Sequence, residues 1–116
     1  MRVRAAAAIA VGLAIAACGG GSKPTAAPTV ASDVRINGFL FKPAVLALKV
    51  GHTATWANFD DIAHTVTSGT PEKPTGVFDS GNRIKGQTFS FTFDKAGTFT
   101  YFCRNHNGMR GEVSVT

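Results

Sequence analysis

Apolar and polar side chains alternate in short runs along the last two-thirds of the chain. One run places Phe89, Phe91 and Phe93 on one face of an extended segment, and shorter runs occur near residues 34–38, 46–50, 54–58, 64–66, 77–79, 99–103 and 113–115. A period of two indicates strands with one buried face, and Gly, Pro, Asn and Asp between the runs mark turns. No window has helical spacing, so the pattern predicts an all-β domain over residues 32–116.

Seven or eight short strands in this length favour a Greek-key β-sandwich or barrel. The segment 68–76 contains two prolines and is predicted to be a loop. All nine phenylalanines fall within the domain and can supply a large apolar area for its core.

The first 31 residues have a different pattern. A short basic start precedes an apolar run over 5–17, which is too short to span a bilayer comfortably and is typical of a signal peptide over residues 1–17. Small residues before Cys18 resemble the bacterial lipobox, in which the cysteine is lipidated; the alternative is cleavage after Ala17 with Cys18 unmodified. Residues 18–31, rich in Gly, Pro, Ala and Thr, are predicted to be the lipidated N-terminus and a flexible linker. We therefore expect an exported protein, in the periplasm or at the cell surface, anchored to a membrane.

Charge excludes one class of function. Without the two arginines of the signal peptide, ten Lys and Arg residues stand against seven Asp and Glu residues, a balance of +3. The positive residues form no stripe with interleaved aromatic residues, so nucleic acid is not the expected partner.

The candidate chemistry lies near the C-terminus. A thiol, an imidazole and a thioether recur at three-residue intervals in Cys103, His106 and Met109, and one more imidazole, His64, lies upstream. Asn and Gly residues after Cys103 favour a turn, which can gather positions i, i+3 and i+6 around one centre. The next strand is expected to resume at Gly111.

Ligand chemistry distinguishes between metals. Zinc accepts thiolate and imidazole, but the thioether of Met109 is a poor zinc ligand. Thiolate and thioether suit Cu(I), and imidazole suits both copper oxidation states. Two imidazoles, a thiolate and a weak axial thioether predict one copper ion in a type 1 site.

Other polar residues near this site have simpler interpretations. His52 is expected at the surface without a metal role, and Asp60 and Asp61 are interpreted as turn residues rather than as an acid/base pair. Arg104 and Arg110 flank the C-terminal loop as solvated charges, with steering toward an acidic partner as the alternative.

Several segments resemble the cupredoxins, the small blue copper proteins of the plastocyanin/amicyanin group, over residues 33–116. The resemblance rests on residues 51–56, 64–69, 78–81 and 97–103, and the C-x2-H-x2-M spacing is similar to that of amicyanin. It implies a cupredoxin-like fold with His64, Cys103 and His106 as equatorial copper ligands and Met109 as the axial ligand.

The resemblance also implies roles for neighbouring residues. Thr65 stands where many members have an asparagine, and its backbone N–H can serve the thiolate. His106 is expected to present its ring edge to solvent as the electron exit, with Gly108 in a flat docking patch.

We interpret the chain as a monomeric, mononuclear type 1 copper protein that shuttles single electrons and is not an enzyme. Its expected partners are redox proteins such as cytochromes or copper oxidases. The alternatives are an extracytoplasmic protein for copper delivery or storage, and a structural β-sandwich in which the Cys, His and Met residues are incidental.

Overall fold

The computed structural model describes residues 32–116. The expected signal peptide, the lipidation site Cys18 and the linker lie outside the described residues. Within residues 32–116 there is no helix of the length and apolarity that crossing a membrane requires.

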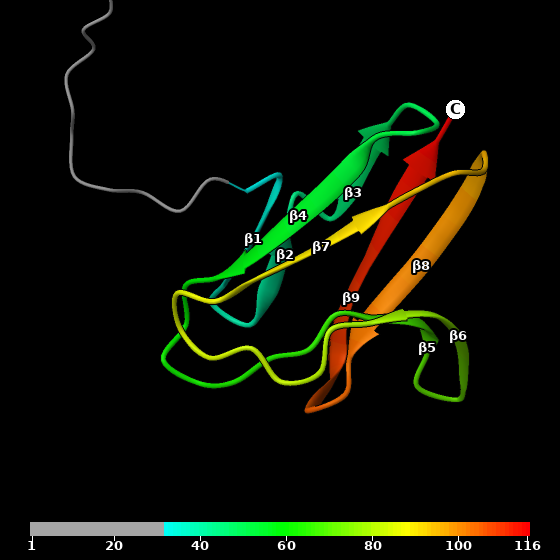
Figure 1. Cartoon of the computed structure of the whole chain (residues 1–116). Coiled ribbons are helices and arrows are strands. Elements are labelled where there is room, and N and C mark those ends of the chain that lie inside the picture. Colours follow the sequence, from blue (N-terminus) through cyan, green and yellow to red (C-terminus); the bar gives the residue numbers. More distant parts are fainter. Residues whose placement is uncertain (1–31) are drawn as a thin grey trace, which may run out of the picture.

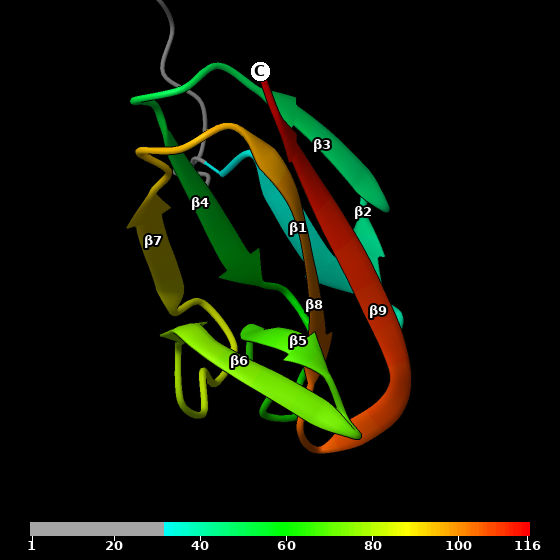
Figure 2. The same ribbon diagram turned by 90° about the vertical axis from the view of Figure 1, so that its right-hand side faces the viewer.

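Two β-sheets pack face to face (Figures 1 and 2). The first sheet has the order β2 (Leu40–Lys42), β1 (Val34–Asn37), β4 (Thr53–Asn58) and β7 (Thr88–Thr92). The second has the order β3 (Val45–Leu48), β9 (His106–Val115), β8 (Gly97–Cys103), β5 (Thr67–Thr70) and β6 (Lys73–Asp79). β1 pairs with β4 and β3 with β9 in parallel, while the other pairs are antiparallel. The all-β prediction is confirmed, although the described strands number nine rather than seven or eight.

The additional strands have identifiable causes. β2 has only three residues and follows β1 after a two-residue turn, so it leaves almost no periodic signal. The loop predicted over 68–76 is wrong, because this segment contains β5 and most of β6. Pro74 is compatible with β6 because that strand lies at the edge of its sheet, where a missing N–H costs no ladder bond.

The core between the sheets is dominated by aromatic side chains. Trp56 is fully buried, and its ring contacts Phe78, Phe89 and Tyr101 at centroid distances of 5.4–5.9 Å. Such tilted and edge-on aromatic pairs stabilise the fold beyond the contribution of the apolar area that they bury. Cys103 and Met109 belong to the same buried cluster, so the core reaches one end of the sandwich and includes two of the candidate ligands.

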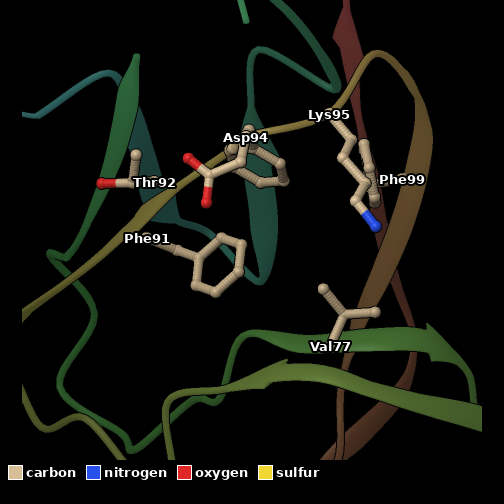
Figure 3. A pocket seen from close by; sticks show the side chains of 7 residues that line it. Val77, Phe91, Thr92, Asp94, Lys95 and Phe99 are labelled. Carbon is tan, nitrogen blue, oxygen red and sulfur yellow. The ribbon is translucent and has the colours of Figure 1, made fainter. Parts of the chain in front are cut away.

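A cavity of about 270 Å³ opens between β6, β7 and β8. Figure 3 shows Val77, Phe91 and Phe99 around it, with Asp94 and Lys95 at its border. None of the candidate metal ligands lines this cavity.

Candidate metal centre

The β4–β5, β6–β7 and β8–β9 connections lie at the end of the molecule that is lowest in Figure 1. His64 comes from the β4–β5 connection, where its backbone pairs with Arg83 of the β6–β7 connection through hydrogen bonds of 3.1 and 2.8 Å. It was predicted to lie on a strand with Val66, but β5 begins only at Thr67. The ladder to Arg83 nevertheless fixes the backbone of His64.

The β8–β9 hairpin positions the other three candidates. Arg104 and Asn105 form its turn, and Cys103 pairs with His106, so β9 begins at His106 and not at Gly111 as predicted. The preceding pair is Phe102 with Arg110, which leaves residues 107–109 as an irregularity without partners on β8. Extra residues on one strand bend it away from its ladder. We expected a longer turn after Cys103 to bring positions i, i+3 and i+6 together. The structure has this bend in β9 instead.

Three candidate donor atoms converge at the site. The Sγ atom of Cys103 lies 3.7 Å from Nδ1 of His64 and 3.6 Å from Nδ1 of His106. All three atoms lie within 4.8 Å of one another. His64 and Cys103 are fully buried, and His106 is half-buried.

These separations fit a trigonal metal site. Metal–sulfur and metal–nitrogen bonds of about 2.3 and 2.0 Å, at angles near 120°, separate the two donor atoms by about 3.7 Å. Both sulfur–nitrogen distances match this value. The His2Cys set with trigonal spacing is that of mononuclear blue-copper centres.

Met109 is the candidate for a fourth, weaker donor. It lies in the irregular part of β9, is 3% exposed, and packs in the same buried cluster as Cys103. A thioether adds a soft donor to the set and favours copper over zinc.

Asp60 orients the imidazole of His64. Its Oδ2 atom lies 2.8 Å from Nε2 of His64. Partial burial opposes ionisation of this carboxyl group, but hydrogen bonds from the amides of Phe39 and Gly38 and from His64 hold the pKa of Asp60 below its usual value. An ionised carboxylate only accepts hydrogen bonds, so this contact favours the tautomer of the neutral imidazole that has its proton on Nε2 and its lone pair on Nδ1, free for a metal.

The sequence interpretation missed the contact of Asp60 with His64, because it assigned Asp60 only a turn role. Asn58 fixes the turn: its amide nitrogen donates to the carbonyls of Ile62 and Arg83, and its Oδ1 accepts from the amide of Asp60. The available signal was a carboxylate four residues before a candidate ligand histidine.

Thr65 contacts the site through two groups, its backbone N–H and its side-chain hydroxyl. Its backbone N–H donates to Sγ of Cys103 over 3.3 Å, which is the contact expected from the sequence. Its hydroxyl oxygen accepts from the amide of Arg104 over 2.8 Å and lies 3.0 Å from the hydroxyl of Thr67. The side chain therefore joins the β4–β5 connection to the β8–β9 turn.

The hydroxyl of Thr65 is one link in a closed chain of hydrogen bonds. Thr67 donates to Asp79 over 3.2 Å, and the other carboxylate oxygen of Asp79 accepts from Nε and Nη2 of Arg104 at 3.1 and 3.0 Å. This series of hydrogen bonds thus begins at the backbone amide of Arg104 and ends at the guanidinium group of the same residue. Arg110 lies 3.9 Å from Glu72, so both arginines that flank the site face a carboxylate.

The remaining predicted residues lie at or near the surface. Gly108 is exposed next to the half-buried His106, whereas His52 is exposed in the turn before β4 and is not part of the donor group. The ring of Phe39 packs edge-on against both His64 and His106, a contact that the sequence did not indicate.

Comparison with known proteins supports the same chemistry. Residues 28–116 match the sequence model of the copper binding proteins of the plastocyanin/azurin family. The chain is 35% identical over 95 residues to amicyanin of Paracoccus denitrificans, covering 79% of this chain and 72% of that protein. It is 32% identical over 84 residues to plastocyanin of Scenedesmus fuscus, covering 66% of this chain and 86% of that protein.

A solved structure extends the match to the fold. The purple cupredoxin from Nitrosopumilus maritimus superposes with a TM-score of 0.68 at 26% identity, covering 74% of this chain and 100% of that one. The cupredoxin-like fold predicted from the sequence is thereby confirmed.

Proposed function

Because this chain belongs to the plastocyanin/azurin family of copper-binding proteins, we propose that it is a single-electron carrier with copper as its cofactor. The observation that carries this proposal is the convergence of one sulfur and two imidazole nitrogens at distances that fit a trigonal site. His64, Cys103 and His106 are the proposed equatorial ligands, and Met109 is the proposed axial ligand. Copper, when bound, supplies a one-electron couple between Cu(II) and Cu(I).

The residues around the donors hold them in place. Asp60 fixes the tautomer and orientation of His64, and the amide of Thr65 directs a partial positive charge at the sulfur of Cys103. The hydrogen-bond chain through Thr65 ties the two ligand-bearing segments together. Ligands that are buried and held in this way move little when the charge at the site changes, and a small rearrangement favours fast electron transfer.

The described residues provide no indication of substrate chemistry at the donor group. The cavity between β6, β7 and β8 is lined by other residues. An electron carrier needs only an exposed edge near its metal, and the half-buried ring of His106 provides one. We therefore assign a carrier function rather than an enzymatic one, with redox proteins such as cytochromes or copper oxidases as partners.

The N-terminal segment supports a proposed location. An apolar run followed by Cys18 and a Gly- and Pro-rich stretch is typical of an exported lipoprotein. In this proposal residues 1–17 are removed, residues 18–31 tether the chain, and residues 32–116 form a monomeric copper domain at a membrane surface. Stable attachment requires more than one acyl chain.

The test is the visible and electron paramagnetic resonance spectrum of the full chain loaded with Cu(II). An intense charge-transfer band and narrow copper hyperfine splitting are expected for the wild type. Cys103→Ser should abolish both features. Cys18→Ser is the matched control, because it removes the other cysteine and should leave the spectrum unchanged.

A colourless wild-type protein with ordinary Cu(II) signals would contradict the carrier function. Ready transfer of copper to a chelator, combined with slow electron exchange, would instead identify a protein of copper delivery or storage.

A further inference from the structure

The cavity between β6, β7 and β8 lies where β8 lacks a second neighbouring strand. β5 pairs only with the last part of β8, through Thr67 and Ser68. The next residue of β5, Gly69, has a φ angle of 101° and lies at a register shift in the β5–β6 pair, where β5 leaves β8. Among the described strands, only β9 pairs with β8 over residues 97–100. One edge of β8 is therefore uncovered, and the space between the two sheets opens beside it.

The wall of the cavity is aromatic. Phe91 lies in β7, Phe93 follows the end of that strand, and Phe99 lies in β8. The ring centroid of Phe93 lies 5.0 Å from that of Phe91 and 5.1 Å from that of Phe99. Phe93 is fully buried, whereas the other two rings are only partly buried, and Val77 of β6 adds a further exposed apolar side chain. The cavity therefore offers a partly exposed apolar surface to a ligand.

Two side chains of opposite charge border this apolar surface. Asp94 and Lys95 belong to the β7–β8 connection, and both line the cavity. In Figure 3 the carboxylate of Asp94 points toward the side of Phe91, whereas the side chain of Lys95 points toward Val77. Within the part of the chain that the structure describes, neither charged group forms an ion pair, with the other or with a third residue. Both charges are therefore available to a ligand.

The volume of the cavity limits the size of the ligand. A volume of about 270 Å³ corresponds to about nine water molecules at about 30 Å³ each. It lies just below the range of typical small-molecule pockets, so it suits a ligand of roughly nine to twelve non-hydrogen atoms. A phospholipid is far larger than this. The ligand that fits is a small molecule with an apolar body and two opposite charges.

We propose that this cavity is a binding site for a free apolar α-amino acid, such as leucine or phenylalanine. The side chain of the ligand packs against the aromatic wall, which buries apolar area and adds ring contacts. The α-ammonium group pairs with Asp94, and the α-carboxylate pairs with Lys95. None of the proposed copper ligands lines the cavity, so this binding goes beyond the electron-carrier function and does not depend on it.

Titration of the ¹⁵N-labelled full chain with L-phenylalanine tests the proposal. The amide signals of the Cu(I) form are followed by two-dimensional NMR. We expect saturable shifts that are largest for residues 91–99 and for Val77, which surround the cavity. The expected dissociation constant is about 1 mM, because a ligand of this size has few contacts to offset the freedom of motion that it loses.

Three related compounds identify the groups that the site recognises. 2-Phenylethylamine lacks the carboxylate, 3-phenylpropanoate lacks the ammonium group, and glycine lacks the apolar side chain. We expect each of the first two compounds to bind about fivefold more weakly than L-phenylalanine, since a partly exposed ion pair contributes little more than this. Glycine should cause no saturable shift, because it has no side chain to pack against the aromatic wall.

Variants of the two charged residues assign each contact. Asp94→Asn should weaken the binding of L-phenylalanine and 2-phenylethylamine about fivefold, and it should not weaken the binding of 3-phenylpropanoate. Lys95→Met keeps an unbranched side chain and should have the opposite selectivity. Asp61→Asn and Lys49→Met are the matched controls, because they remove exposed charges that do not line the cavity, and they should leave all affinities unchanged.

The outcomes separate this proposal from the carrier function. Absence of saturable shifts at about 20 mM L-phenylalanine, about twenty times the expected dissociation constant, would overturn the site. Equal affinities for all three aromatic compounds, or charge variants without effect, would overturn the recognition of an amino acid. The charge-transfer band of Cu(II) should be the same in all these variants. A wild type without this band would contradict the carrier function alone, because the same titration can be carried out on the copper-free full chain.

Discussion

The hydroxyl group of Thr65 offers a sharp test of how the metal site is supported. Thr65→Val keeps the branched shape and the backbone N–H that donates to Cys103, and it removes only the hydroxyl. The change interrupts the chain of hydrogen bonds between the amide and the guanidinium group of Arg104. Any effect therefore reports on the connection between the two ligand-bearing segments.

The magnitude follows from burial. Thr65 is 3% exposed, and its oxygen accepts from the amide of Arg104. This hydrogen bond is part-buried, and losing a typical intramolecular hydrogen bond costs about 0.5–1.5 kcal/mol. We expect the free energy of unfolding of the copper-free protein to fall by this amount, out of a total of about 5–15 kcal/mol for a typical domain.

Urea unfolding followed by the fluorescence of Trp56, the single tryptophan, measures the change. Thr98→Val is the matched control, because Thr98 is exposed on β8, and it should leave the unfolding midpoint unchanged. The charge-transfer band should keep its position in Thr65→Val. Unchanged stability would refute the structural role of the hydroxyl, and a large shift of the band would show that it acts on the sulfur directly.

Three further changes test other parts of the structure. Met109→Leu should keep copper bound and raise the reduction potential, because the weak axial donor is lost; an unchanged potential in voltammetry would show that Met109 is not axial. Gly111→Ala should reduce the free energy of unfolding by about 1–3 kcal/mol, because its methyl group would overlap the buried ring of Tyr101. Gly108→Ala, which meets no atom within 4 Å, is its control, and equal stability of the two variants would contradict this packing argument. Partial burial opposes ionisation of Asp79, but hydrogen bonds from Gly81, Arg104 and Thr67 hold its pKa below the usual value. Asp79 therefore stabilises the fold above about pH 4, and this contribution is lost as the pH falls through the lower, folded-state pKa. Asp79→Asn should make the acid limb of the stability profile less steep in urea titrations between about pH 2 and 6, and an identical limb would contradict the assignment.

The sequence was informative where spacing alone determines geometry. Cys103, His106 and Met109 are close in the chain, and the alternation before Cys103 predicts the side of the strand to which its sulfur points. The chemistry of these side chains then restricts the metal. The same local logic failed for β2, which is too short to show a period. It also failed for β5 and β6, because Pro71 between them and Pro74 within β6 suggested a loop.

The missed residues depend on contacts between distant segments. Asp60 acquires its role only when the β1–β2 turn and His64 reach the same carboxylate. Phe39 lies 25 positions before His64 in the sequence, yet its ring touches both histidines. The contact of Phe39 has no local signature, and the only local signal for Asp60 is its place four residues before His64, so the structure was needed to find both contacts.

The position of β9 in the second sheet has a consequence for the order of events in assembly. β9 carries His106 and Met109, and it joins β3 to β8, with Val45 paired to Glu112. A pairing over so many residues closes late, because the entropy of the intervening chain must first be overcome. The donor set itself depends on the β8–β9 hairpin, which pairs Cys103 with His106, and on the arrival of His64 from the β4–β5 connection. Copper bound by all four residues marks a finished fold. A chain that ends before β9 lacks both His106 and Met109, and it also lacks the strand that joins β3 to β8 in the second sheet.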